Sequence, residues 1–134
     1  MTAWRIGDEL PPRTDAPLTV TEFVRYQGAS GDMNPVHHDQ VAAEAVGYDR
    51  PLAVGMLGAG RLAAYLTDTF GPRAVRAFAV RFSAPAWPGD ALTYKARVVD
   101  VVEVDDGHEL VLEATCTTAC GDVHVGGTAR FRVG

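Results

Sequence analysis

Residues that could do chemistry gather in one short stretch, SGDMNPVHHDQ, at positions 30–40. The stretch could be a solvated turn, because glycine, aspartate, asparagine and proline are typical turn residues. It could also be a metal site, but the adjacent His37 and His38 would not easily turn toward one ion, and the spacing matches no common metal motif. We therefore expect no metal here. The third interpretation is an acid–base pair.

Asp32 and His37 are the two residues that could form this pair. An aspartate and a histidine five residues apart on a bent loop can both reach one water molecule, and a neighbouring carboxylate orients an imidazole and increases its basicity. Gly55 begins a later apolar segment, where a backbone N–H at the positive end of a helix could stabilise a substrate oxyanion. These residues together could hydrate a double bond conjugated to a carbonyl.

A helix directly before the stretch is needed to position it. Thr19 and Glu22 have the spacing of a capping box, with Leu18 and Phe23 placed as a hydrophobic staple. The sequence predicts that this helix runs to about Gly28, because Gly28 and Gly31 should break it.

The stretch itself is predicted to be a loop that connects two helices. Pro35 disfavours helical geometry in the residue before it, which predicts a loop over 32–38. Asp39 is a suitable N-cap for a short helix over 40–46, which Gly47 would end. Loops held between rigid elements often carry functional residues.

The remaining chain predicts one apolar helix followed by strands. The segment 54–70 is apolar on almost every side and rich in small residues, which indicates a buried helix. Alternating apolar and polar residues then predict an antiparallel sheet with one polar face, with strands at 75–84, 93–104, 109–120 and 122–133. This order predicts an α+β hot-dog fold, a curved antiparallel sheet wrapped around a central buried helix. Its exposed edge favours a dimer with a second copy or a sister chain.

Composition narrows the possible functions. A chain of 134 residues that is 47% hydrophobic and 22% charged predicts a single globular domain over 1–134. The net charge of −5 argues against nucleic-acid binding, and no apolar run is long enough for a membrane span or a signal peptide. Cys116 and Cys120 are expected to be free thiols, which favours the cytoplasm.

The motifs SGDMNPVHHD, GML and VRFSAPAWPGDAL resemble the MaoC-like dehydratases, also called (R)-specific enoyl-CoA hydratases. Within that family, the chain resembles the B subunit of the heterodimeric (3R)-hydroxyacyl-ACP dehydratases. The resemblance covers nearly the whole chain and implies a hot-dog fold. It also implies reversible hydration of trans-2-enoyl thioesters to (3R)-hydroxyacyl thioesters, a hydro-lyase reaction that requires no cofactor.

The resemblance assigns roles to four residues. It implies a catalytic dyad of Asp32 and His37, with Asn34 shaping the loop and hydrogen-bonding within the site, and an oxyanion donor at the N–H of Gly55. The chain departs from the family at two positions. Val54 replaces a histidine that usually precedes the glycine, and Ala63 stands where some members have a serine.

Several alternatives remain open from the sequence. The acyl group could be carried by CoA or by acyl carrier protein. Four arginines could bind the phosphate groups of CoA or an acidic carrier protein: Arg61, Arg73, Arg76 and Arg81. The chain could instead be a hot-dog thioesterase or the binding subunit of a heteromeric dehydratase. His108 follows a turn and His124 falls on the polar face of its strand, so both are expected to be dispensable surface residues.

Overall fold

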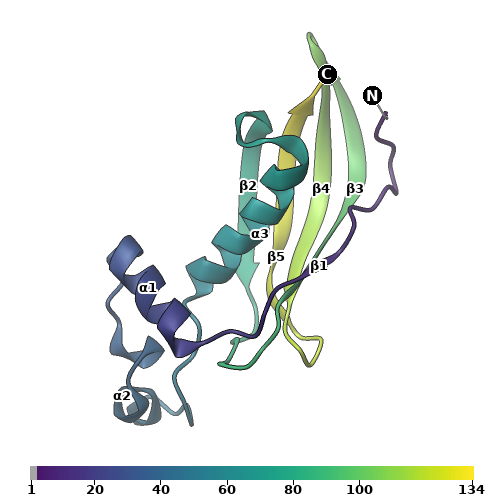
Figure 1. Cartoon of the computed structure of the whole chain (residues 1–134). Helices are drawn as coiled ribbons and strands as arrows, with labels where there is room; N and C mark the ends of the chain where they lie inside the picture. The colour runs from purple at the N-terminus through teal and green to yellow at the C-terminus, as the bar shows by residue number, and fades with distance from the viewer. Residues whose placement is uncertain (1–2) are drawn as a thin grey trace.

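The computed structural model describes residues 3–134, which form a small set of helices and one antiparallel sheet (Figure 1). The α-helices are α1 (Val20–Ser30), α2 (Gln40–Ala45) and α3 (Gly55–Phe70), and the 3-10 turns are η1 (Pro35–His37) and η2 (Pro72–Ala74). The strands are β1 (Arg13–Thr14), β2 (Val75–Phe82), β3 (Thr93–Val104), β4 (Gly107–Thr117) and β5 (Val123–Val133).

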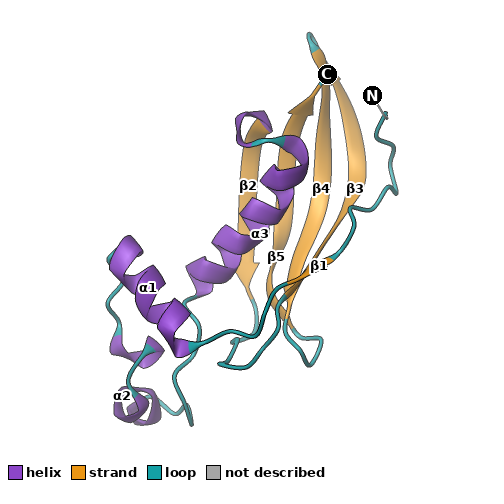
Figure 2. Ribbon diagram, in the orientation of Figure 1, coloured by secondary structure: helices purple, strands orange, loops and turns teal. Residues whose placement is uncertain are grey.

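The sheet curves around α3, which confirms the predicted arrangement. Its strand order is β1-β3-β4-β5-β2, and every neighbouring pair is antiparallel. Helix α3 crosses one face of this sheet, while α1 and α2 lie beyond one end of it (Figure 2). The core between them contains large buried side chains from both layers, including Phe23, Leu62, Leu66, Tyr94 and Phe131. Each such side chain stabilises the fold by about 1.5–3 kcal/mol.

The capping box at the start of α1 is confirmed. The Thr19 N–H donates to Glu22 Oε2 at 2.8 Å, and the Glu22 N–H donates to Thr19 Oγ1 at 3.2 Å. The helix continues past Gly28 and ends at Gly31, whose φ of 79° is a left-handed cap. The helix therefore passes the first of the two glycines expected to break it and ends at the second. An exposed helical glycine such as Gly28 costs only about 1 kcal/mol, which tertiary packing offsets.

The predicted loop over 32–38 contains a short turn of 3-10 helix, η1. Pro35 occupies its first position, and Asn34 caps it by accepting a hydrogen bond at Oδ1 from the Val36 N–H at 3.2 Å. The predicted N-cap of α2 is confirmed, since Asp39 Oδ1 accepts from the N–H of Val41 at 2.8 Å. Pro35 suits the first turn of η1 because proline has no N–H that would need a hydrogen-bond acceptor.

Helix α3 is buried along one face rather than on every side. Gly58, Ala59 and Leu62 face the sheet, whereas Gly60 and Ala64 are exposed. Apolar composition alone therefore overstated the burial of this helix. Within the described residues, no helix is long and apolar enough to cross a membrane.

Strand β2 forms an open edge of the sheet. It pairs with β5 on one side only, and none of its residues is fully buried. The phenylalanines Phe78 and Phe82 are 37% and 49% exposed. An unpaired strand that carries exposed aromatic side chains is a typical pairing surface.

Candidate active site

His37 is held by a backbone anchor. Its Nδ1 lies 2.7 Å from the carbonyl oxygen of Leu52, so Nδ1 carries the proton and donates. In the neutral ring this leaves a lone pair on Nε2, which makes no hydrogen bond to another residue within 3–134. A histidine fixed in this tautomer can accept a proton at Nε2.

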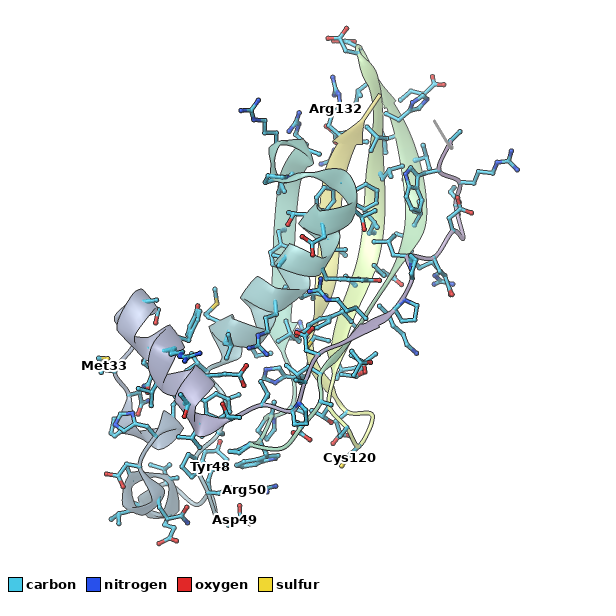
Figure 3. The ribbon with its side chains drawn as sticks, viewed as in Figure 1. Met33, Tyr48, Asp49, Arg50, Cys120 and Arg132 are labelled. Atoms are coloured by element: carbon cyan, nitrogen blue, oxygen red, sulfur yellow. The ribbon has the colours of Figure 1, made fainter. Side chains whose placement is uncertain are left out.

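His37 borders a cavity of about 280 Å³, here called the His37 cavity. Its walls also include Tyr48, Gly55, Phe82 and His124. Tyr48 packs edge-on against Trp87 with ring centroids 5.8 Å apart, and Figure 3 shows Tyr48 and Arg50 near each other below α1. A larger hollow of about 350 Å³ lies against β3 and β4 and contains no predicted site residue, so the smaller cavity is the candidate active site.

Gly55 is the first residue of α3 and lines this cavity. Val54 occupies the N-cap and has no side-chain oxygen, so no side chain caps the helix. The first N–H groups of a helix have no partner within the helix and carry partial positive charge. A Cβ at Gly55 would lie 2.9 Å from the ring of Phe82, so a side chain here would displace that ring.

Asp32 and Asn34 lie on the same loop as His37 but do not line the cavity. The Asn34 N–H donates to Asp32 Oδ1 at 3.3 Å, and the Asp32 side chain is otherwise exposed. No hydrogen bond or ion pair joins Asp32 to His37. The structure thus brings His37 and Gly55 together and leaves Asp32 five residues away along the loop.

Gln27 anchors this loop and was not predicted. Its side chain is fully buried; Nε2 donates to the Asn34 carbonyl at 2.9 Å, and Oε1 accepts from His38 Nδ1 at 2.7 Å. The spacing of four residues from Phe23 could have revealed this residue, because it places Gln27 on the buried face of α1.

His124 was predicted to lie on the surface, and this was wrong. It is 2% exposed and lines the His37 cavity. The reason is a β-bulge: Cys116 pairs with Val125 and Thr117 with Val123, so His124 has no partner on β4. An extra residue in one strand breaks the alternation and re-aims the side chain. His108 is exposed as expected.

Arg61 pairs with carboxylates of its own chain. Its Nη2 donates to Glu22 Oε1 at 2.7 Å, and its Nη1 lies 3.9 Å from Asp15 Oδ2. Burial alone would raise the pKa of Glu22, but the hydrogen bonds from Arg61 and Thr19 outweigh burial and lower it. The other three arginines considered for carrier binding, Arg73, Arg76 and Arg81, are exposed.

Few of the described side chains are arranged to hold an ion. Among residues 3–134, no three His, Cys, Asp or Glu side chains gather in a group that could bind a metal. Cys116 is a buried free thiol and Cys120 is an exposed one. The polar groups that the cavity wall offers include the imidazoles of His37 and His124 and the first residue of α3, Gly55.

Comparison with known proteins relates the chain to a group of hydratases. The MaoC-like domain pattern matches residues 2–119. The chain is 34% identical over 121 residues to 3-hydroxyacyl-thioester dehydratase X of Mycobacterium tuberculosis, covering 90% of this chain but only 39% of that protein. It is 30% identical over 118 residues to the (R)-specific enoyl-CoA hydratase of Rhodospirillum rubrum, covering 87% of this chain and 80% of that protein.

Solved structures with the same fold include hydratases and a heteromeric complex. The (R)-hydratase from A. caviae involved in PHA biosynthesis superposes with a TM-score of 0.86 at 21% identity, covering all of both chains. A chain of the ChsH1–ChsH2 complex from Mycobacterium tuberculosis superposes with a TM-score of 0.81 at 25% identity, again covering all of both chains. These likenesses confirm the hot-dog fold.

Proposed function

This chain belongs to the MaoC-like domain family, and from that premise we propose that it hydrates trans-2-enoyl thioesters reversibly to (3R)-3-hydroxyacyl thioesters. One observation carries the proposal. His37, with Nδ1 anchored to Leu52, borders the same cavity as the uncapped helix amide of Gly55. A base and an oxyanion donor in one cavity are the two groups that hydration of a conjugated thioester needs.

The proposed reaction uses one water molecule held by His37 at the cavity wall, and it requires the exposed Asp32 side chain, which lies outside the cavity in this structure, to turn toward that water. The oxygen of this water bonds to C3 while His37 Nε2 accepts one of its protons, and that proton is then delivered to C2 on the same face. The Asp32 carboxylate accepts a hydrogen bond from the other hydrogen of the water and orients it. The Gly55 N–H stabilises the negative charge that develops on the thioester oxygen. Dehydration is the reverse sequence.

The test replaces each member of the dyad in turn. Asp32→Asn keeps the shape of the side chain and removes its charge, and His37→Ala removes the proton acceptor. Each is expected to lower kcat for enoyl-thioester hydration by ~10²–10⁴. Because both residues act on one water, the double variant should be scarcely slower than either single variant. The loss of enoyl ultraviolet absorbance measures the rate.

His108→Gln is the matched control, since it changes an exposed histidine far along the chain and should leave kcat unchanged. The melting temperature should change little in Asp32→Asn, because this side chain is exposed, and His37→Ala should lose only its hydrogen bond to Leu52, which contributes about 0.5–1.5 kcal/mol. Wild-type turnover by Asp32→Asn would refute the dyad. Release of free thiol without hydration would instead identify a thioesterase.

The proposed substrates are acyl-CoA or acyl carrier protein thioesters. The exposed arginines Arg73, Arg76 and Arg81 lie on η2 and β2 and offer positive charge to a phosphate-bearing carrier. Assays that compare enoyl-CoA with enoyl-acyl carrier protein across chain lengths will separate the two carriers. We also propose the cytoplasm as the compartment, since both cysteines are unpaired.

We propose that the working unit is a dimer that pairs at β2. This strand is unpaired on its outer side, and its exposed Phe82 also lines the His37 cavity, so a partner there would help to enclose the site. The partner could be a second copy or a sister hot-dog chain, as the ChsH1–ChsH2 complex suggests. A stable and active monomer at micromolar concentration in sedimentation experiments would contradict this proposal.

A further inference from the structure

An arginine beside the His37 cavity has only a weak partner in its own chain. The Arg50 side chain is 51% exposed, and its guanidinium carbon lies 4.9 Å from the ring centroid of Trp87. Among residues 3–134, its only ion pair joins Arg50 Nε to Asp49 Oδ1 at 3.8 Å, and the Asp49 side chain is 87% exposed. Exposed ion pairs of this kind contribute little free energy, so the charge of Arg50 remains available to a ligand.

Two aromatic side chains connect Arg50 to the cavity wall. Trp87 packs against Tyr48 with ring centroids 5.8 Å apart, and Tyr48 lines the cavity while remaining 39% exposed. Figure 3 shows Tyr48 and Arg50 together below α1. Leu52, two residues after Arg50, also lines the cavity. The exposed guanidinium therefore lies at the rim of the cavity and is open to solvent.

The backbone that carries this rim also positions the proposed base. The Leu52 carbonyl accepts the hydrogen bond from His37 Nδ1 at 2.7 Å, and the Ala53 N–H donates to the Ala86 carbonyl at 2.8 Å. Ala86 directly precedes Trp87, so the second hydrogen bond ties the chain segment of the arginine to that of the indole. A group bound at this rim is therefore held at a fixed place relative to the imidazole.

The chemistry of the rim suits a phosphate group. A guanidinium stacked on an aromatic ring presents its N–H groups at its edge, and this planar fork can donate to two oxygens of one phosphate. The chain as a whole carries a net charge of −5, so an anionic ligand needs positive charge close to where it binds. CoA and acyl carrier protein both hold the acyl group on a phosphopantetheine arm, which brings a phosphate with the thioester.

We propose that Arg50, stacked on Trp87, binds the phosphate of the phosphopantetheine arm that CoA and acyl carrier protein share. This inference rests on the proposed function and identifies a carrier-binding residue of the same site. Arg73 and Arg76 are less well placed for this role. They follow the far end of α3, and the 16 residues of that helix span about 24 Å from the cavity.

The test compares one trans-2-enoyl group on four carriers: CoA, acyl carrier protein, phosphopantetheine, and pantetheine, which has no phosphate. Arg50→Gln should raise KM for the three phosphate-bearing thioesters by about three- to thirtyfold at low ionic strength. The value of kcat should change little, because the phosphate is bound equally before and during the reaction. KM for the pantetheine thioester should not change. Asp49→Asn removes a competing carboxylate and should lower KM for the phosphate-bearing thioesters.

Arg97→Gln is the matched control. Arg97 is also exposed and pairs with one exposed carboxylate, that of Glu113, so its loss should change no KM. Arg50→Lys keeps the charge but not the planar fork and should lose only part of the affinity. An unchanged KM ratio of phosphopantetheine to pantetheine thioester in Arg50→Gln would overturn the inference. A loss confined to enoyl-CoA would also overturn it, because Arg50 would then contact the nucleotide part of CoA.

Two measurements keep this inference separate from the proposed function and from folding. Calorimetry with hexanoyl-CoA and hexanoyl-pantetheine, which have no double bond, should show tighter binding of the CoA thioester by wild type and a smaller difference in Arg50→Gln. That result without any measurable hydration would refute the proposed function alone. Raising the ionic strength should raise the wild-type KM for the phosphate-bearing thioesters more than for the pantetheine thioester. Hydration that is insensitive both to salt and to Arg50→Gln would refute the role of Arg50 alone.

Discussion

Gln27 ties the loop that carries His37 to helix α1, and the variant Gln27→Leu tests this tie. Gln27 donates to the Asn34 carbonyl and accepts from His38 Nδ1, at 2.9 and 2.7 Å. These two contacts bracket His37 on both sides along the chain. Leucine has a similar volume and remains compatible with the buried face of α1, but it can neither donate nor accept.

The expected cost follows from these two hydrogen bonds. Each contributes about 0.5–1.5 kcal/mol net, so their joint loss is about 1–3 kcal/mol. The lower half of this range applies, because Asn34 and His38 are exposed and water can replace part of what they lose. For a chain of this size, that corresponds to a melting temperature lower by roughly 3–8 °C. The loosened loop should also lower kcat by about 10- to 100-fold, since small misplacements of catalytic groups are costly.

Thermal unfolding and the hydration assay measure the two effects. His38→Ala is the matched control, because it removes only one of the two hydrogen bonds and should give about half of the shift in melting temperature. Adding His38→Ala to Gln27→Leu should then cost little more, since the shared bond is already absent. An unchanged melting temperature together with an unchanged kcat for Gln27→Leu would refute the role of this residue.

Two further predictions use the altered pKa values. Burial raises the pKa of the Cys116 thiol to about 12. A thiol reagent at about pH 8 should therefore label Cys120 alone in the native chain and both cysteines after denaturation. Labelling of two thiols in the native chain would contradict this. Burial alone would raise the pKa of Glu22, but hydrogen bonds from Arg61 and Thr19 lower it. The carboxylate therefore stabilises the fold above pH 4.5, and this stability is lost as the pH falls through the lowered pKa. Glu22→Gln should therefore melt below wild type at neutral pH and approach it in acid, whereas a gap that does not change with pH would show that ionisation of Glu22 contributes nothing.

Signals between near neighbours predicted most of the elements from the sequence alone. The Thr19 and Glu22 capping box, the Asp39 N-cap and the alternation over 93–104 each depend on residues only a few positions apart. The same is true of the loop that holds Asp32 and His37, because Pro35 and its neighbours disfavour a continuous helix there. Such signals act before any tertiary contact forms, so they can be recognised along the chain.

Contacts between distant residues decided how the candidate site is built. The bulge that turns His124 inward depends on the register of β5 against β4, and the room for its ring comes from Gly58 on α3. Gln27 is important only because packing buries its face of α1 and because two loop residues, Asn34 and His38, hydrogen-bond to its side chain. Arg61 is unavailable to a carrier only because Glu22 lies within hydrogen-bonding distance. Strand register and helix packing depend on the whole fold rather than on local residue patterns, and for that reason only the tertiary structure showed that a second histidine shares the cavity of the first.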